Sequence, residues 1–282
     1  MTMPTYTTAL ALVSDPARFS PDARPPRWMP PAPFESVDLR PGRVVLIGAP
    51  PGAGKTTLAL QLVFDVAAQH GLRAVVANVE MSADVLTDKL LARLARVDVT
   101  AMMNRDLVEA ERSRVLSAVA THADALGRIA FHVGSNTVAS VYESARTFDA
   151  RLVTLDYIQR FALDAADDRV RLDRLMGQVR RVADQGLAVL VVSSVSRRAG
   201  RSGSTYAGLD MASYRGSAEL EFGADSAYLL DADLRHGIAT LRQTKNRYGP
   251  LRDVPLRLDG PHQEFSEGDA LDAYDAAPRG KG

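Results

Sequence analysis

The chain has 282 residues, 46% of them hydrophobic and 24% charged, with 34 basic and 34 acidic side chains and no cysteine. This is the composition of a globular protein, and since no apolar run approaches the ~18 residues of a membrane span and no signal-type N-terminus is present, we expect a cytoplasmic protein with no membrane partner. Balanced charge excludes a global field that steers the whole molecule to nucleic acid, and the lack of cysteine excludes disulfides, thiolate zinc sites and cysteine nucleophiles.

The first 36 residues are expected to form an extended N-terminal arm. Proline recurs through them, at Pro16, Pro21, Pro25, Pro26, Pro30, Pro31 and Pro33. Because proline fixes φ and removes a backbone donor, this region cannot hold a regular helix or a central strand. The short apolar piece at residues 9–13 could form one or two helical turns, alone or against a neighbouring subunit, but a helix of that length is marginal by itself.

Residues 44–60 read VVLIGAPPGAGKTTLAL, a buried strand that passes through a glycine-rich turn into a helix. Small residues in such a turn let backbone N–H groups surround phosphate oxygens, and the new helix points its positive end at the same charge. Lys55 can reach the β- and γ-phosphates, and the Thr56 hydroxyl is placed to hold Mg²⁺. The sequence therefore predicts a nucleotide phosphate site made of Pro51, Gly52, Ala53, Gly54, Lys55, Thr56 and Thr57.

After this loop the pattern alternates apolar strands with amphipathic helices, which is typical of a mostly parallel α/β sheet. In chain order we expect a helix ending near Gly71, a strand at 74–79, helices at 85–97 and 107–120, a strand at 129–133, a helix at 138–148, a strand at 152–155, a helix at 170–185, and strands at 187–192, 226–230, 238–244 and 254–258. The polar residues 261–282 are expected to be a flexible tail. The globular domain is thus expected at residues 37–260.

Three features at the ends of these elements point to function. Glu80 follows the strand at 74–79, at an edge where such sheets carry their sites. Asp156 follows the strand at 152–155, where a carboxylate can complete a Mg²⁺ site through water. Residues 195–210 place Arg197, Arg198 and Arg201 in a glycine- and serine-rich loop, which suits either phosphate contacts with nucleic acid or an ordinary solvated loop.

Residues 37–258 resemble the ATPase domain of the DnaB family of replicative helicases, a hexameric branch of the RecA-like ATPases. The resemblance is carried by GAPPGAGKTT, by NVEMS with LLARLARVD, by LDYIQ, and by RGSAELEFGAD with TKNRYGP. It implies a RecA-like α/β core with a mostly parallel central sheet flanked by helices and a C-terminal antiparallel extension. It also implies an ATP-hydrolysing helicase or translocase on single-stranded DNA, with ATP and Mg²⁺ bound at subunit interfaces of a homo-oligomer.

The resemblance assigns a role to each matching residue. Glu80 would orient and deprotonate the attacking water, and Asp156 would serve the Mg²⁺ site. Lys245 and Arg247 match a K-x-R pair that acts on the γ-phosphate bound by the neighbouring subunit. Single-stranded DNA would pass the loops that carry Arg197, Arg198, Arg201 and Arg215.

Two departures from the family keep an alternative open. Ser194 stands where the family has a glutamine that links the γ-phosphate to the DNA loops, and serine is too short for that role. The family's N-terminal helical domain has no counterpart in the residues before Val37. Both departures favour an ATP-gated DNA-binding accessory protein, such as a loader, a recombination mediator or a mobile-element replication factor, that does not unwind DNA.

Overall fold

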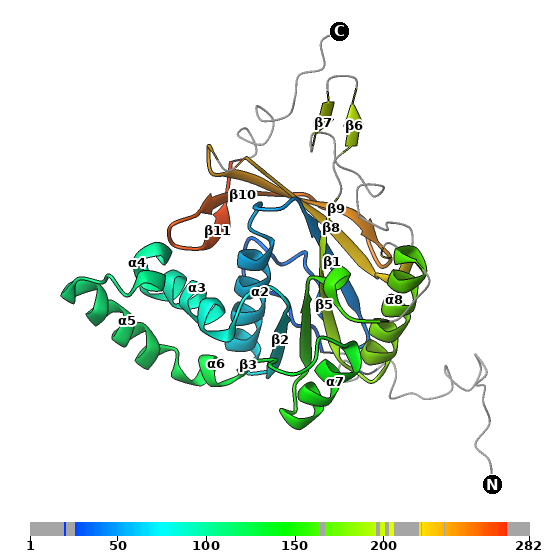
Figure 1. Ribbon diagram of the computed structural model, residues 1–282, viewed down its shortest axis with the longest axis horizontal. Helices are drawn as coiled ribbons and strands as arrows, with labels where there is room; N and C mark the ends of the chain where they lie inside the picture. The colour runs from blue at the N-terminus through cyan, green and yellow to red at the C-terminus, as the bar shows by residue number, and fades with distance from the viewer. Residues whose placement is uncertain are drawn as a thin grey trace.

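The computed structural model describes residues 20, 26–163, 167–195, 198–200, 203–205, 220, 222–233 and 235–269. Its centre is a nine-stranded sheet in the order β11-β10-β9-β8-β1-β5-β4-β2-β3 (Figure 1). Six neighbouring strands run parallel: β1 (Val44–Ala49), β2 (Ala74–Asn78), β3 (Ile129–Phe131), β4 (Leu152–Asp156), β5 (Ala188–Ser194) and β8 (Ser226–Asp233). The expected fold class, a mostly parallel α/β sheet, is therefore confirmed.

Helices cover both faces of this sheet. One face carries α2 (Lys55–His70), beside which lie α3 (Ala83–Ala95), α4 (Val99–Asn104), α5 (Glu109–Thr121) and α6 (Ala123–Gly127), while the other face carries α7 (Val138–Thr147) and α8 (Asp168–Asp184) (Figure 1). The two-residue period of β1 explains the two cores. Val45 and Ile47 pack on the side of α2, and Val44 and Leu46 pack on the side of α7 and α8. In the described part of the chain, no helix combines the length and apolarity needed to cross a bilayer.

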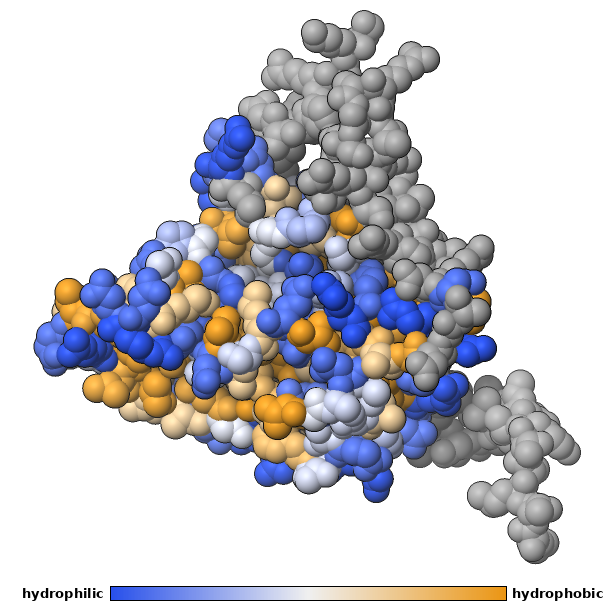
Figure 2. Space-filling model, viewed as in Figure 1, coloured by the Kyte–Doolittle hydropathy of each residue, from blue (hydrophilic) through white to orange (hydrophobic). Residues whose placement is uncertain are grey.

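Helices α3 to α5 extend away from the sheet and have a small core of their own, formed by Ala95, Val97, Met102 and Ala118. Apolar side chains also gather on the outer surface over α5, at the left of Figure 2. On α5 itself, Leu116 is 69% exposed. The short helices α4 and α6 are absent from the expected pattern because six and five residues are too few to show a helical period.

The C-terminal strands are antiparallel, as expected for the extension. They are β9 (Ile238–Asn246), β10 (Val254–Asp259) and β11 (Glu264–Glu267). Strand β11 lies within the expected flexible tail, so the domain boundary at residue 260 is too early. Phe265 of β11 is 1% exposed and packs into the core. The Gln61 side chain of α2 donates to the Phe265 carbonyl and accepts from its N–H, both at 2.8 Å.

The expected extended arm is also wrong for its described end, residues 26–36. Trp28 forms an antiparallel bridge with Leu39, and Phe34 is fully buried in the core beside α2. The backbone carbonyl of Ser36 accepts a 2.6 Å hydrogen bond from the buried Tyr228 hydroxyl. Proline prevents regular structure here, but it does not prevent an irregular segment from burying its aromatic residues. Residues 1–19 and 21–25 lie outside the described part of the chain.

The segment at residues 195–210, expected as an arginine-containing loop, includes a small hairpin, formed by β6 (Arg198–Gly200) and β7 (Gly203–Thr205), which pair antiparallel. The rest of that segment from residue 206, and residues 211–219, lie outside the described residues. The remaining expected strands and helices are present, with ends that differ by a few residues.

Candidate phosphate and metal site

The turn between β1 and α2 is built to receive an anion. Gly54, which precedes α2, has a φ of 84°, and a Cβ added there would lie 2.9 Å from the Phe265 ring, so only glycine fits. No side chain caps the N-terminus of α2, and its first turn contains no acidic residue. The N–H groups and the positive end of the helix are therefore available to a phosphate.

A buried carboxylate faces this turn from the end of β4. The Thr56 hydroxyl donates to Asp156 Oδ2 at 2.7 Å, and Asp156 is 2% exposed. Burial raises the pKa of Asp156, while the Thr56 hydrogen bond, the Lys55 charge and a hydrogen bond from Asn78 act in the opposite direction. Hydroxyl and carboxylate oxygens are the ligands that Mg²⁺ takes beside nucleotide phosphates. The pair therefore fits the metal role expected of Thr56 and Asp156.

Asn78, at the end of β2, joins this carboxylate to the turn that carries Glu80. Its amide nitrogen donates to Asp156 Oδ2 at 2.7 Å. Its amide oxygen accepts from the N–H groups of Glu80 at 2.9 Å and Met81 at 2.7 Å. Glu80 is itself exposed to solvent. The sheet thus brings Glu80 and Asp156 to one edge, as expected, through a residue that the sequence analysis missed.

The side chains of the loop have partners of their own. Lys55 Nζ lies 5.6 Å from the centre of the Tyr157 ring. The Thr57 hydroxyl donates to the Gln263 side chain at 2.7 Å, so it points to the β10–β11 turn. Only the backbone of Thr57 is left for the phosphate role expected of that residue. Pro51 and Gly52 are exposed, whereas Ala53 is buried beneath the turn.

A glutamine joins the ends of β4 and β5. Gln159 lies in the short 3-10 helix η3 (Ile158–Arg160), directly after the Asp156–Tyr157 segment. Its amide nitrogen donates to the Ser193 hydroxyl at 2.8 Å and to the Ser194 carbonyl at 3.1 Å, and its oxygen accepts from the Ser194 N–H at 3.2 Å. Ser194 is thus bound through its backbone by an amide from the neighbouring strand end.

Lys245 and Arg247 lie at the opposite edge of the sheet. Lys245 pairs with Ala227 near the end of β9, and Arg247 follows directly after that strand. Arg247 Nη1 donates to Asp225 Oδ1 at 3.0 Å, and Asp225 Oδ2 accepts from the Val44 N–H at 2.9 Å. Val44 begins β1, whereas the phosphate loop follows its end. Five steps of about 3.3 Å separate the ends of β1 by roughly 16 Å. Arg247 is therefore remote from the loop of its own chain.

The residues expected to bind nucleic acid are only partly described. Arg197, Arg201 and Arg215 lie outside the described residues, and of Arg198 the structure describes the backbone, which starts β6. Their role therefore stays a prediction.

Comparison with known proteins agrees with the resemblance seen in the sequence. A family model for the DnaB-like helicase C-terminal domain matches residues 36–267. The replicative DNA helicase DnaB of Haemophilus influenzae is 24% identical over 248 residues, which cover 82% of this chain and 52% of the relative. A probable plasmid replicative DNA helicase of Chlamydia trachomatis is 23% identical over 241 residues, with the same coverage. The chain thus spans about half the length of these curated relatives.

Two solved structures share the fold. One of them, a structure of an ATPase domain, superposes with a TM-score of 0.71 at 18% identity, covering 82% of this chain and 86% of that one. A DnaB-like replicative helicase, described with its interactions with primase, superposes with a TM-score of 0.77 at 19% identity, covering 94% of this chain and 68% of that one. These likenesses confirm the expected RecA-like fold.

Proposed function

The chain belongs to the family of DnaB-like helicase C-terminal domains, and on that basis we propose that it hydrolyses ATP at interfaces between its copies and moves along single-stranded DNA. The assembly would be a ring, as in a hexamer, or a filament. The observation that carries the proposal is that the expected catalytic residues lie at two opposite edges of the sheet. The phosphate loop, Asp156 and Glu80 gather at one edge of the sheet, and Arg247 lies at the other.

The residues at the phosphate loop have complementary roles in this proposal. The backbone around Gly54 and the N-terminus of α2 bind the phosphates, and Lys55 neutralises their charge. Thr56 and Asp156 would hold Mg²⁺, which supplies positive charge where negative charge develops. Glu80 accepts a proton from the attacking water, because its exposed carboxylate stands on a turn that Asn78 fixes beside Asp156.

Arg247 would act on the ATP of a neighbouring copy. The roughly 16 Å between the two ends of β1 prevents it from reaching the phosphates bound to its own chain. A finger that works between copies requires a head-to-tail interface, and such interfaces generate rings or open helices. Arginine fingers in P-loop enzymes are worth ~10³–10⁵ in rate.

DNA coupling would run through the ends of β4 and β5. Gln159 joins the segment after Asp156 to the backbone of Ser194, and Arg197 follows three residues after Ser194. A change at the Mg²⁺ site could therefore alter the segment that carries Arg197 and Arg198, which would contact the DNA backbone.

A second candidate function is an ATP-gated accessory protein that binds DNA without unwinding it. Ser194 favours this alternative, because its short side chain cannot reach a γ-phosphate as a glutamine would. Unwinding of a forked duplex, measured beside the ATPase rate, separates the two. ATP hydrolysis that depends on single-stranded DNA, without strand separation, supports the accessory role.

Mixing two inactive variants tests whether the ATP site is shared between two copies, with Arg247 of one copy completing the site of the next. Arg247→Ala leaves a copy with a sound site but no finger for its neighbour, whereas Glu80→Gln leaves the finger and removes the base. We expect the mixture to regain ATPase activity at interfaces where an intact Glu80 meets an intact Arg247. Activity no greater than the sum of the separate variants, in mixtures that co-assemble by mass, would contradict the shared site.

A further inference from the structure

Asp225 is a fully buried carboxylate that the proposed reaction does not use. It directly precedes β8, and its backbone N–H donates to the Val44 carbonyl at 2.8 Å. Its side chain accepts from the Val44 N–H at 2.9 Å. The carboxylate is therefore fixed at the start of β1, near the middle of the sheet order, where it has little freedom to move.

Two arginines share this carboxylate from different elements. Arg180 of α8 donates to Oδ2 at 2.5 Å, and Arg247 donates to Oδ1 at 3.0 Å. A second nitrogen of Arg180 reaches the Gly42 carbonyl at 3.3 Å. A buried carboxylate needs a close cation. Arg180 of α8 satisfies that need at a shorter distance, so Asp225 does not depend on Arg247 alone.

Arg247 is bound to Asp225 through both its backbone and its guanidinium, yet much of its side chain is exposed. Its backbone N–H donates to the Asp225 carbonyl at 2.9 Å, and Nη1 donates to the Asp225 side chain. Of the described residues, only Asp225 binds its guanidinium, and 49% of the side chain is exposed. A guanidinium carries five N–H donors in a rigid fork, so most of them remain outside this contact.

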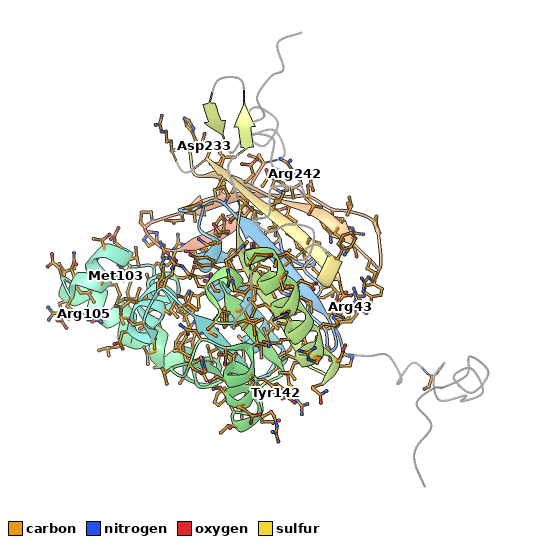
Figure 3. All side chains as sticks on the ribbon, turned by 45° about the vertical axis from the view of Figure 1, so that its right-hand side comes forward. Arg43, Met103, Arg105, Tyr142, Asp233 and Arg242 are labelled. Atoms are coloured by element: carbon orange, nitrogen blue, oxygen red, sulfur yellow. The ribbon has the colours of Figure 1, made fainter. Side chains whose placement is uncertain are left out.

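Tyr248 contacts the same carboxylate, that of Asp225. Its hydroxyl lies 3.4 Å from Asp225 Oδ1, and the Arg43 guanidinium stacks over its ring at 3.7 Å from the centre. Arg43 itself is paired with Asp38 at 2.7 Å. Figure 3 shows Arg43 on the side of the molecule opposite Met103 and Arg105, near the lower end of α8. Arg247 thus belongs to a cluster in which Asp225 and Tyr248 also contact each other.

We propose that Asp225 is the positioning residue of Arg247. It holds the guanidinium through one nitrogen and through the backbone, so that the remaining donors face outward where a neighbouring copy would dock. Arg180 in turn holds Asp225. The inference rests on the proposed function, in which Arg247 acts on the neighbour's γ-phosphate, and adds the device that fixes the direction of the finger.

The size of the effect follows from what positioning contributes. A misplacement of about 1 Å in a group that acts on the transition state can cost ~10²-fold in rate. Asp225→Asn keeps the shape but removes the charge, so Arg247 loses its fixed direction and keeps its own charge. We expect kcat to fall ~10–100-fold, less than the ~10³-fold or greater loss expected for Arg247→Ala. The KM for ATP should stay unchanged because the variant's own phosphate loop is intact.

A double-mutant cycle tests whether Asp225 acts through Arg247. Asp225→Asn should lower kcat in the parent chain and have no further effect in Arg247→Ala, because the group that it positions is gone. Asp88→Asn is the matched control. It removes a carboxylate that is 7% exposed and paired at 2.7 Å with Arg105, a residue with no role in the proposed site. It should leave kcat unchanged.

Mixing with Glu80→Gln distinguishes the inference from the proposed function. Asp225→Asn should be rescued in the mixture as Arg247→Ala is, since Glu80→Gln supplies an intact finger. If Arg247→Ala is rescued and Asp225→Asn is not, or if the two losses multiply in the double variant, the positioning role is overturned. If Arg247→Ala itself is not rescued, the shared site fails and the inference fails with it.

Arg180→Lys decides the matter if Asp225→Asn does not fold. Lysine keeps a positive charge beside Asp225 but cannot reach both Asp225 and the Gly42 carbonyl with a planar fork. We expect a smaller loss of kcat at unchanged KM, again absent in the Arg247→Ala background and rescued by Glu80→Gln. A loss that persists in the Arg247→Ala background would overturn the inference.

Discussion

Phe265 tests whether the C-terminal strand is an integral part of the domain. Its ring is 1% exposed and lies against Gly54 of the phosphate loop. The Gln61 side chain donates one hydrogen bond to the Phe265 backbone and accepts another from it. Phe265→Ala leaves those backbone bonds in place, so β11 stays docked and a cavity remains where the ring was. Truncating a buried phenylalanine costs about 3–5 kcal/mol, and we expect the upper half of this range because the site cannot collapse.

Urea unfolding of the nucleotide-free protein measures this loss. The midpoint should fall while the m-value stays constant, because the same surface is exposed on unfolding. Phe222→Ala is the matched control, since Phe222 is 73% exposed and its removal should change the free energy of unfolding by no more than about 0.5 kcal/mol. If Phe265→Ala lowered the free energy of unfolding by less than about 1 kcal/mol, the reasoning would be refuted, because removing a well-packed buried ring costs more than that.

Three further substitutions test other parts of the account. Lys55→Ala should abolish ATP binding or turnover and leave urea unfolding unchanged, and undiminished hydrolysis would contradict the phosphate site. Glu80→Gln should bind ATP as the parent does but lose ~10²–10⁴-fold in single-turnover rate, and equal rates would remove Glu80 as the base. Tyr228→Phe should cost about 1–3 kcal/mol of unfolding free energy, because the buried Gln243 amide and the Ser36 carbonyl each lose a partner. Unchanged unfolding would show that water replaces the hydroxyl.

The central part of the fold could be predicted from sequence because its strands are buried on both faces. Such strands appear as continuous apolar runs, as in β1 and β5, and a glycine-rich turn marks the end of β1. The phosphate loop carries its own chemistry in a short stretch of sequence. Asp156 and Glu80 could be assigned to the same edge because both follow parallel strands.

The partners of these residues could not be predicted, because they depend on which strands are neighbours. Asn78 lies opposite Asp156 only because β2 pairs with β4 in that register. A polar residue at the end of an apolar strand was the available signal. Asp225 likewise gains its importance from Arg180 and Arg247, which lie 45 and 22 residues away along the chain.

The two ends of the domain were misjudged for another reason. Residues 26–36 and 261–267 are rich in proline or polar side chains, and each buries a single phenylalanine, Phe34 or Phe265. One anchoring ring produces no periodicity. The contact that holds Phe265, through Gln61 on α2, joins residues 204 positions apart and leaves no local trace in the sequence.

The most direct test of the account measures the mass of the protein and its ATPase rate together, with and without single-stranded DNA. We predict that ATP hydrolysis accompanies an assembly of several copies and that single-stranded DNA raises its rate, because in the proposed function the catalytic site is complete only between copies. A monomer that hydrolyses ATP at the full rate, indifferent to DNA, would contradict the claim that Arg247 completes the site of a neighbour.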